Sequence, residues 1–329
     1  MKNKLTSTYT ICFGAMLSCL LWGSAAPCIK IGYSLFEISG TASQLLFAGI
    51  RFIIAGILTI LFGSILSRKI LIPQKSSIPD VFKLAMVQTV LQYIFYYIGL
   101  ANTSGVNASI INASNVFVSL LFSCLLFKFE KLTTRKIFGS VIGFLGVILI
   151  NISGAAINGN FSFAGEGAIF MSCLSYGLSS CLIKRYSQRE NPVTLSGYQF
   201  FTGGIVLTII GFLCGGRITH VSTQAVMLLI YLALVSSIAY TLWGILLKYN
   251  PVGKVAVFGF MNPIFGVILS AWRGADRKSY RVYGNRAYDS LLRTFRGRET
   301  NFQKYFGSIF RLVSCFPLLP ETDPSYSAC

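Results

Sequence analysis

The sequence predicts an all-α fold: a polytopic bundle of membrane-spanning helices, built as two inverted five-helix repeats with the tenth helix missing. Of its 329 residues, 54% are apolar and only 12% are charged, whereas a soluble globular domain carries about 25% charged residues. The apolar residues gather in runs of about 20, each long enough to cross a hydrocarbon core of about 30 Å as a helix. This composition argues against a soluble enzyme.

Nine apolar runs, separated by short polar connectors, predict the membrane spans. The first run is longer than the apolar part of a signal peptide, so we expect it to be retained as a span. The remaining runs follow at short intervals. The nine lie near residues 10–31, 43–66, 82–100, 106–127, 137–152, 163–183, 193–214, 224–247 and 253–271.

Lysine and arginine are concentrated in alternate connectors. They precede the first span and follow the second, fourth, sixth and eighth, as in Arg68, Lys131, Arg185 and Lys248. If each run crosses once, these connectors share one side, and the positive-inside rule puts the N-terminus in the cytoplasm. This placement explains the net charge of +18 without a nucleic-acid partner. We expect a multi-pass protein of the cell membrane whose main partner is the lipid bilayer.

An internal repeat relates the two halves of the chain. Because each copy holds five spans, an odd number, the second copy must enter the membrane from the opposite side. Inverted repeats are typical of secondary transporters, whose halves move around a site near the midplane. We assign residues 1–152 to the first repeat and 153–271 to the second. The matched residues are Ser18, Cys19, Trp22, Gly23 and Lys30 with Ser172, Cys173, Tyr176, Gly177 and Lys184, the segment from Arg51 with that from Gln199, and Asn115 with Asn262.

Several short motifs occur in a fixed order between residues 10 and 271. They are Leu21-Trp22-Gly23 with Pro27, Arg51-Phe52, Tyr96-Tyr97-Ile98-Gly99-Leu100-Ala101 leading to Ala108, Glu130, and Asn262-Pro263. In this order they resemble the EamA-like members of the drug/metabolite transporter superfamily. The resemblance implies ten helices, cytoplasmic termini and a central substrate cavity between the halves. Val116 departs from the pattern, because it stands where Asn262-Pro263 suggests a proline, and this leaves no basis for a helix break in span four.

The segment 272–329 differs from the rest of the chain. It holds ten lysines and arginines and no apolar run long enough to span a membrane. The family pattern implies a Gly-Glu motif and a tenth helix here. A reading frame displaced by one nucleotide within the Trp272 codon permits both, so a frameshift is one explanation, and a natural basic cytoplasmic tail is the other. We expect a disordered non-family tail, and a truncated product without transport activity is the alternative function.

Polar and aromatic residues inside the spans are candidates for the substrate cavity, because each must face protein, water or a partner. In span four, Asn112, Asn115 and Ser119 recur at helical spacing and form one polar stripe. Such Asn and Ser residues could instead bond across helices, at about 0.6 kcal/mol each. The full set is Trp22, Arg51, Gln88, Gln92, Tyr96, Asn112, Asn115, Ser119, Tyr176, Tyr240, Trp243 and Asn262.

Arg51 is the one candidate that carries a charge. It could bind an anionic substrate group or receive a proton-coupled signal. It could instead bond to backbone carbonyls or extend to the membrane surface, as long cationic side chains do. The matching Gln199 favours a shared structural role in hydrogen bonding. The other candidates form an uncharged, aromatic and amide-bearing set, which suits amphipathic organic solutes better than bare ions.

The sequence shows no catalytic, nucleotide-binding or metal-binding motif. No acidic pair lies within a span, His220 is the only histidine, and no Gly-x-x-x-x-Gly-Lys-Ser/Thr motif occurs. We expect no enzyme and no cofactor. The prediction is a secondary transporter or exporter of small organic metabolites or drug-like solutes by alternating access. Gly139-x-x-x-Gly143 in span five indicates close helix packing, between the halves or in a homodimer.

Overall fold

The computed structural model describes residues 6–103, 105–152 and 162–272, and every regular element within these ranges is a helix. The all-α prediction is therefore confirmed for the described residues. Six helical segments are long and apolar enough to cross a membrane by length and composition. Four are single helices: α2 (Thr8–Leu35), α3 (Thr41–Ser67), α10 (Pro192–Leu213) and α11 (Thr223–Tyr249). The segment Lys75–Asn102 is made of η1 (Lys75–Ser77), α4 (Ile78–Leu84), η2 (Ala85–Leu91) and α5 (Gln92–Asn102). The segment Phe163–Tyr186 is made of η4 (Phe163–Gly167) and α9 (Ala168–Tyr186).

The other predicted spans also fall on helices. Shorter apolar helices cover Ile110–Leu126 and Val252–Gly266. The predicted tail and the site of the tenth helix lie, from residue 273 onward, outside the described residues. Span four comprises α6 (Gly105–Asn112), α7 (Asn115–Leu121) and η3 (Phe122–Leu126), span five is α8 (Thr134–Ile152), and span nine comprises α12 (Val252–Ala256), η5 (Val257–Phe260) and α13 (Met261–Trp272).

Local sequence sets several helix ends. Asn191 and Ser222 cap α10 and α11, accepting hydrogen bonds from the N–H groups of Val193 and Ala225 at 2.9 and 3.2 Å. Such caps satisfy donors that have no partner inside the helix. Pro192 occupies the first turn of α10, where a missing N–H costs nothing. These caps fix where spans seven and eight begin.

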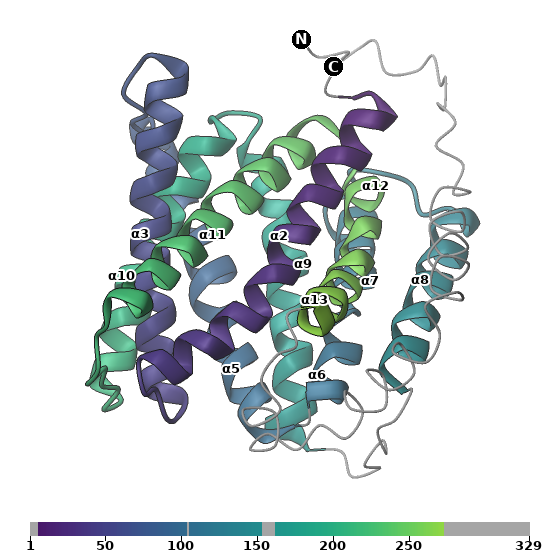
Figure 1. Ribbon diagram of the computed structural model, residues 1–329. Helices are drawn as coiled ribbons and strands as arrows, with labels where there is room; N and C mark the ends of the chain where they lie inside the picture. Colours follow the sequence, from purple (N-terminus) through teal and green to yellow (C-terminus); the bar gives the residue numbers. More distant parts are fainter. Residues whose placement is uncertain (1–5, 104, 153–161, 273–329) are drawn as a thin grey trace.

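The bundle is organised around α3 and α10, which pack more extensively than any other pair of described helices. They lie at one edge of the molecule, with α8 at the other (Figure 1). Elsewhere in the bundle, α2 packs on α11 and α13, and α9 packs on α5 and α7. The first and second halves of the chain are thus interleaved throughout the core.

Glycines allow α3 and α10 to approach backbone to backbone. A Cβ at Gly56 would lie 2.7 Å from the Gly197 carbonyl, and one at Gly49 would lie 2.9 Å from the Gly204 carbonyl. The residue number rises along α3 as it falls along α10, so the two helices are antiparallel. Small residues at such crossings are how membrane helices gain close packing.

Spans four and nine are both broken, at matching positions. In span four, α6 ends at Asn112 and α7 begins at Asn115, and turn bonds such as Ser114 N–H to Ile111 O (2.9 Å) fill the gap. In span nine the 3-10 segment η5 precedes α13. The expectation drawn from Val116, that span four lacks a basis for a break, is wrong. A tighter turn replaces the α-helical bonds there without proline.

The connectors after spans two, four, six and eight meet at one end of the bundle. The Gln74 N–H bonds to Glu190 at 2.9 Å, the Gly253 N–H bonds to Glu130 at 2.9 Å, and Gln188 Nε2 bonds to the Lys248 carbonyl at 3.2 Å. The cation-rich connectors therefore share a side, as their charge predicted. Which side faces the cytoplasm stays a prediction.

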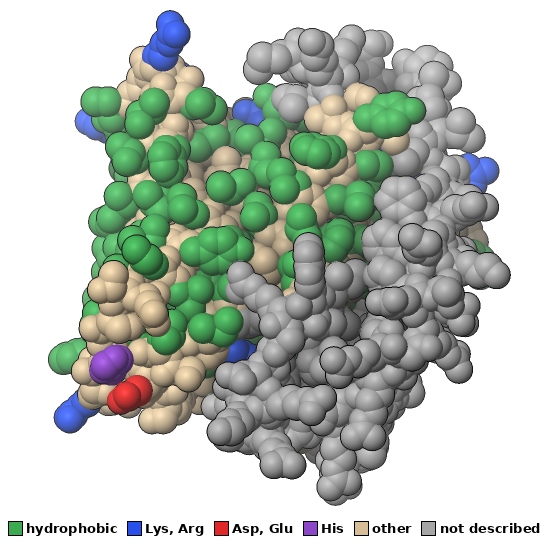
Figure 2. Space-filling view, in the orientation of Figure 1, with side chains coloured by type: hydrophobic (Ala, Val, Ile, Leu, Met, Phe, Trp, Pro, Cys, Tyr) green, Lys and Arg blue, Asp and Glu red, His purple; other side chains and the backbone are tan. Residues whose placement is uncertain are grey.

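Apolar side chains cover the outside of the described helices. Leu66, Phe212 and Leu213 are among the large hydrophobic residues that remain exposed. On the face seen in Figure 2, hydrophobic side chains fill the band over α3, α10 and α11, and charged side chains lie toward its ends. A contiguous apolar surface of this size needs an apolar surrounding, which the lipid bilayer supplies.

Candidate functional site

An aromatic cluster, defined as Trp22, Phe52, Tyr93, Phe200, Tyr240 and Trp243, joins the two halves inside the bundle. The Phe52 and Phe200 rings stack at 5.1 Å with an interplanar angle of 12°. The hydroxyls of Tyr93 and Tyr240 hydrogen-bond at 3.1 Å. Each of these pairs takes one member from each half of the chain, so the cluster bridges the halves.

The contacts of the cluster are repeated by a two-fold relation. Phe52 meets Tyr93 edge to face at 4.7 Å, and Phe200 meets Tyr240 edge to face at 4.9 Å. Aromatic pairs of this geometry contribute about 0.5–1.5 kcal/mol each beyond their buried area. The same relation holds away from the cluster, where the matched Cys19 and Cys173 thiols donate to the carbonyls of Phe258 and Ile111 at 3.1 and 3.3 Å.

Three predicted site residues, Trp22, Tyr240 and Trp243, come together in the cluster. The Trp22 ring lies 4.9 Å from Tyr240 and 5.1 Å from Trp243. The indole N–H groups of both tryptophans are buried and have no hydrogen-bond partner among the described residues. Two unpaired donors therefore sit side by side on this part of the cluster.

Arg51 lies at the other side of the cluster, with 3% of its surface exposed. Its guanidinium carbon is 4.5 Å from the centre of the Phe52 ring and 5.8 Å from that of Tyr93. Its Nε is buried without a partner among the described residues. The matched Gln199 differs, because its side-chain oxygen accepts a 2.7 Å hydrogen bond from Thr89. Gln199 Nε2 is, like Arg51 Nε, buried without a partner among the described residues, so the shared role in hydrogen bonding stays a prediction.

Three further predicted site residues lie in span three: Gln88, Gln92 and Tyr96. Gln88 lies in η2, a π-helical stretch, and such stretches are frequent at functional sites. The side-chain oxygens of Gln88 and Gln92 are buried without partners among the described residues. The Tyr96 ring packs 5.9 Å from that of Tyr97. Span three thus offers unpaired acceptors, whereas the Trp22 side offers donors.

The polar stripe of span four faces α9 and span nine, and its polar groups bond mostly to nearby backbone or connectors. The Ser119 hydroxyl returns to the Asn115 carbonyl at 2.7 Å, and Ser123 bonds to Glu130 at 2.6 Å. The Asn112 carbonyl lies 3.7 Å from the Cys173 sulfur. The two serines therefore bond to other protein groups, which favours a structural role for them over a role in the substrate cavity.

Tyr176 lies in α9, and Asn262 lies at the start of α13. Both are partly buried. The Tyr176 carbonyl accepts bonds from Ser179 and Ser180 at 2.8 and 3.0 Å. Asn115 Oδ1 lies 3.9 Å from where a Cβ of Gly259 would stand, so the two broken spans cross near the matched asparagines.

Two residues of the cluster were missed as site candidates: Phe52 and Phe200. The signal that could have found Phe52 and Phe200 was already in the repeat, since they follow Arg51 and Gln199 in the matched segments. An aromatic residue in an apolar run is normally interpreted as a residue that packs in the core. Only their position at the contact of the two halves distinguishes them.

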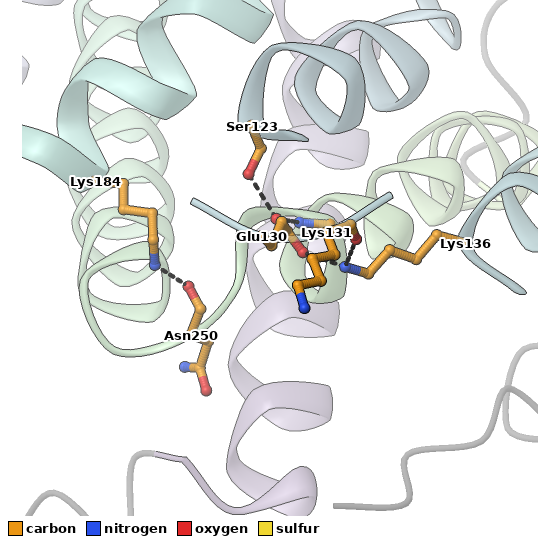
Figure 3. Close-up of polar contacts among 7 residues, drawn as sticks. Ser123, Glu130, Lys131, Lys136, Lys184 and Asn250 are labelled. Carbon is orange, nitrogen blue, oxygen red and sulfur yellow. Dashed lines mark hydrogen bonds and ion pairs between the residues drawn. The ribbon is translucent and has the colours of Figure 1, made fainter. Parts of the chain in front are cut away.

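A second polar group lies among the cation-rich connectors, around Glu130 (Figure 3). Its carboxylate accepts bonds from Ser123 at 2.6 Å and from the Gly253 N–H at 2.9 Å, and it pairs with Lys136 at 2.9 Å. Nearby, Lys184 donates to the carbonyls of Leu247 and Asn250. Glu130 therefore ties the connector after span four to the start of span nine.

Gly143 packs against the Phe260 ring, so the close packing predicted for span five is made with span nine.

Within the described ranges, no group of three or more His, Cys, Asp or Glu residues is placed to hold a metal ion. The chemistry available at the cluster is aromatic contact, hydrogen bonding and one positive charge.

Known proteins resemble this chain along most of its length. The sequence model of the EamA-like transporter family matches residues 9–152 and 163–277. The uncharacterized transporter YvbV of Bacillus subtilis is 25% identical over 274 residues, covering 82% of this chain and 85% of that protein. The uncharacterized inner membrane transporter YedA of Escherichia coli is 26% identical over 277 residues, covering 81% and 84%.

Two further similarities agree with these. An uncharacterized transporter of Archaeoglobus fulgidus is 28% identical over 262 residues, covering 77% of this chain and 86% of that protein. A protein of known crystal structure shares the fold with a TM-score of 0.66 at 17% identity, covering 85% of this chain and 96% of that one. The family match and the relatives agree on a membrane transporter, and the solved structure agrees on the fold.

Proposed function

The chain belongs to the EamA-like transporter family, and from that membership we propose that it is a secondary transporter that exports small organic metabolites or drug-like solutes by alternating access. The family and the transporter-named relatives point away from an enzyme. With its membrane-spanning helices, it contacts lipid, and its substrate is a small molecule. Alternating access and outward transport are the parts that we propose.

The two-fold relation between contacts of the halves carries this proposal. The Phe52–Tyr93 and Phe200–Tyr240 pairs, the two thiol bonds and the reciprocal glycine contacts of α3 and α10 each have a mate in the other half. The antiparallel course of α3 and α10 fits a second copy that enters the membrane from the opposite side. Such halves can rock against each other around a fixed site.

The aromatic cluster is the proposed centre of that motion. It lies where the halves meet, and it is held by ring contacts and one hydroxyl pair rather than by ion pairs. These contacts are individually weak, so a solute that supplies equivalent contacts can replace them. At the cation-rich end, the Gly253–Glu130 and Gln74–Glu190 bonds also join the halves and must break when that end opens.

We place the protein in the cell membrane with its N-terminus in the cytoplasm. The meeting of all four cation-rich connectors at one end supports this orientation, because the positive-inside rule assigns that end to the cytoplasm. Solute would then pass from this end through the cluster to the end where the Arg217 N–H bonds to Ser43 at 3.0 Å.

Solute counterflow in vesicles tests the proposal. The purified full chain is reconstituted, and uptake of labelled solute is followed for L-amino acids, short organic acids and cationic dyes. We expect uptake of at least one class above empty vesicles. Trp22→Ala should abolish this uptake, and Phe212→Ala, which removes an exposed ring of the outer face, should not. Equal uptake in both variants would remove the cluster as the site.

The alternative is a frameshifted product without transport activity. The observation that favours it is the basic segment from residue 272, most of which lies beyond residue 277, where the family match ends. A gene read in the shifted frame after the Ala271 codon tests it. Uptake restored only by that gene supports the alternative, and equal uptake by both versions contradicts it.

A further inference from the structure

We propose that the transported solute carries a carboxylate or a similar anionic group on an apolar body and that Arg51 binds the anionic group, an inference that rests on the transport function proposed above. Arg51 is almost fully buried, in the body of a membrane-spanning helix. A guanidinium does not lose its charge in proteins. The charge must therefore be compensated inside the bundle.

The described residues do not supply that compensation. No hydrogen bond or ion pair of the described residues reaches the Arg51 guanidinium, and its Nε is buried without a partner. The five carboxylates in the described ranges lie at helix ends or in connectors: Glu37, Asp80, Glu130, Glu166 and Glu190. Contacts with the Phe52 and Tyr93 rings recover only part of the cost of burying the charge.

The matched position in the other half carries no charge. Gln199 stands at the equivalent place in α10 and is neutral: its Oε1 accepts a 2.7 Å hydrogen bond from Thr89, while its Nε2 is buried without a partner among the described residues. The two-fold scaffold therefore holds an uncharged side chain at that position. The positive charge of Arg51 is thus present in the first half of the chain only. The counter-charge that Arg51 lacks is that of an anion.

The surroundings of Arg51 define the rest of the ligand. Tyr93 links it to Tyr240 through the 3.1 Å hydroxyl pair, and Tyr240 lies 4.9 Å from Trp22. The unpaired indole N–H groups of Trp22 and Trp243 are further donors. Rings, donors and one cation suit an amphipathic organic anion. A cationic solute would meet the positive charge of Arg51 with no carboxylate to offset it.

Three probes of the same shape and different charge test the inference: 3-phenylpropionate, 3-phenylpropanol and 3-phenylpropylamine. Binding to the purified full chain in detergent is followed by tryptophan fluorescence, to which Trp22 and Trp243 contribute. In the wild type we expect the acid to bind most tightly and the amine least. Arg51→Gln, which copies Gln199, should weaken acid binding roughly ten- to a hundredfold and leave the alcohol unchanged. Arg68→Gln removes an exposed cation and should change neither.

Each result decides the question. Alcohol binding by Arg51→Gln reports a folded cluster, and the ranking of probes in the wild type needs no variant. Acid binding no tighter than that of the alcohol or the amine, or unchanged in Arg51→Gln, overturns the role of Arg51 and leaves the transport proposal standing. If no probe binds and vesicles take up only neutral or cationic solutes, the inference also fails. If vesicles take up no solute of any class, the proposed function fails and the inference fails with it.

Discussion

Replacing Gly56 by alanine tests the close contact of α3 and α10, on which the arrangement of the two halves depends. The added Cβ would lie 2.6 Å from the Phe201 amide nitrogen and 2.7 Å from the Gly197 carbonyl oxygen. Ordinary contacts between carbon atoms are about 3.5–4.0 Å. The atoms that it meets belong to backbone, which cannot rotate away, so the helices must separate by about 1 Å.

The cost follows from that separation. Overpacking costs about 1–3 kcal/mol, and replacing a helical glycine by alanine returns up to about 1 kcal/mol. We therefore expect a net loss of up to about 2 kcal/mol, which lowers the melting temperature by several degrees. Gly204→Ala, whose Cβ would lie 2.6 Å from the Ile53 amide nitrogen, should cost about the same, because it makes the two-fold related contact.

The assay is thermal unfolding in detergent, read with a thiol-reactive dye. Cys19, Cys173 and Cys181 are free and buried, so they react only as the bundle opens. Gly146→Ala is the matched control, since no atom lies within 4 Å of its added Cβ, and it should raise the melting temperature slightly. If Gly56→Ala melts at or above the wild type, as the control does, the backbone contact inferred here is wrong.

Three further predictions concern the connectors, the cluster and the orientation. Glu130→Gln should lower the free energy of unfolding by about 1–3 kcal/mol, and Lys136→Met should cost less because its ion pair is partly exposed; equal losses in chemical denaturation would contradict this. Tyr93→Phe and Tyr240→Phe should each cost about 0.5–1.5 kcal/mol, and the double variant no more than the larger single one; additive losses would deny the shared hydrogen bond. A membrane-impermeant maleimide should label exposed Cys214 in intact cells, and labelling only after permeabilisation would reverse the assigned orientation.

Much of the fold could be predicted from the sequence, because bilayer thickness and charge placement act on whole segments. All nine apolar runs fall on helices, and the cation-rich connectors meet at one end. The break in span four could not be predicted from residue types. Asn112 and Asn115 flank a turn that no proline or glycine marks, and helix packing decides the backbone there.

The site was harder to predict, for a physical reason. Helical spacing shows which residues share a face, and it does not show which helix covers that face. The span-four stripe has the predicted periodicity, yet Ser119 and Ser123 bond to a backbone carbonyl and to Glu130. Arg51 and Gln199 match in sequence but differ in partners, a difference that appears only in three dimensions.

The most direct test of the account is a distance measurement across the two halves. Spin labels replace Lys75 and Gln188, which are exposed on connectors of different halves at the cation-rich end, in a variant without native cysteines. Pulsed EPR in lipid vesicles then compares the protein with and without the solute that the counterflow panel identifies. Alternating access predicts two distance populations whose ratio the solute shifts. A single distance that stays unchanged while the vesicles transport that solute would contradict the account.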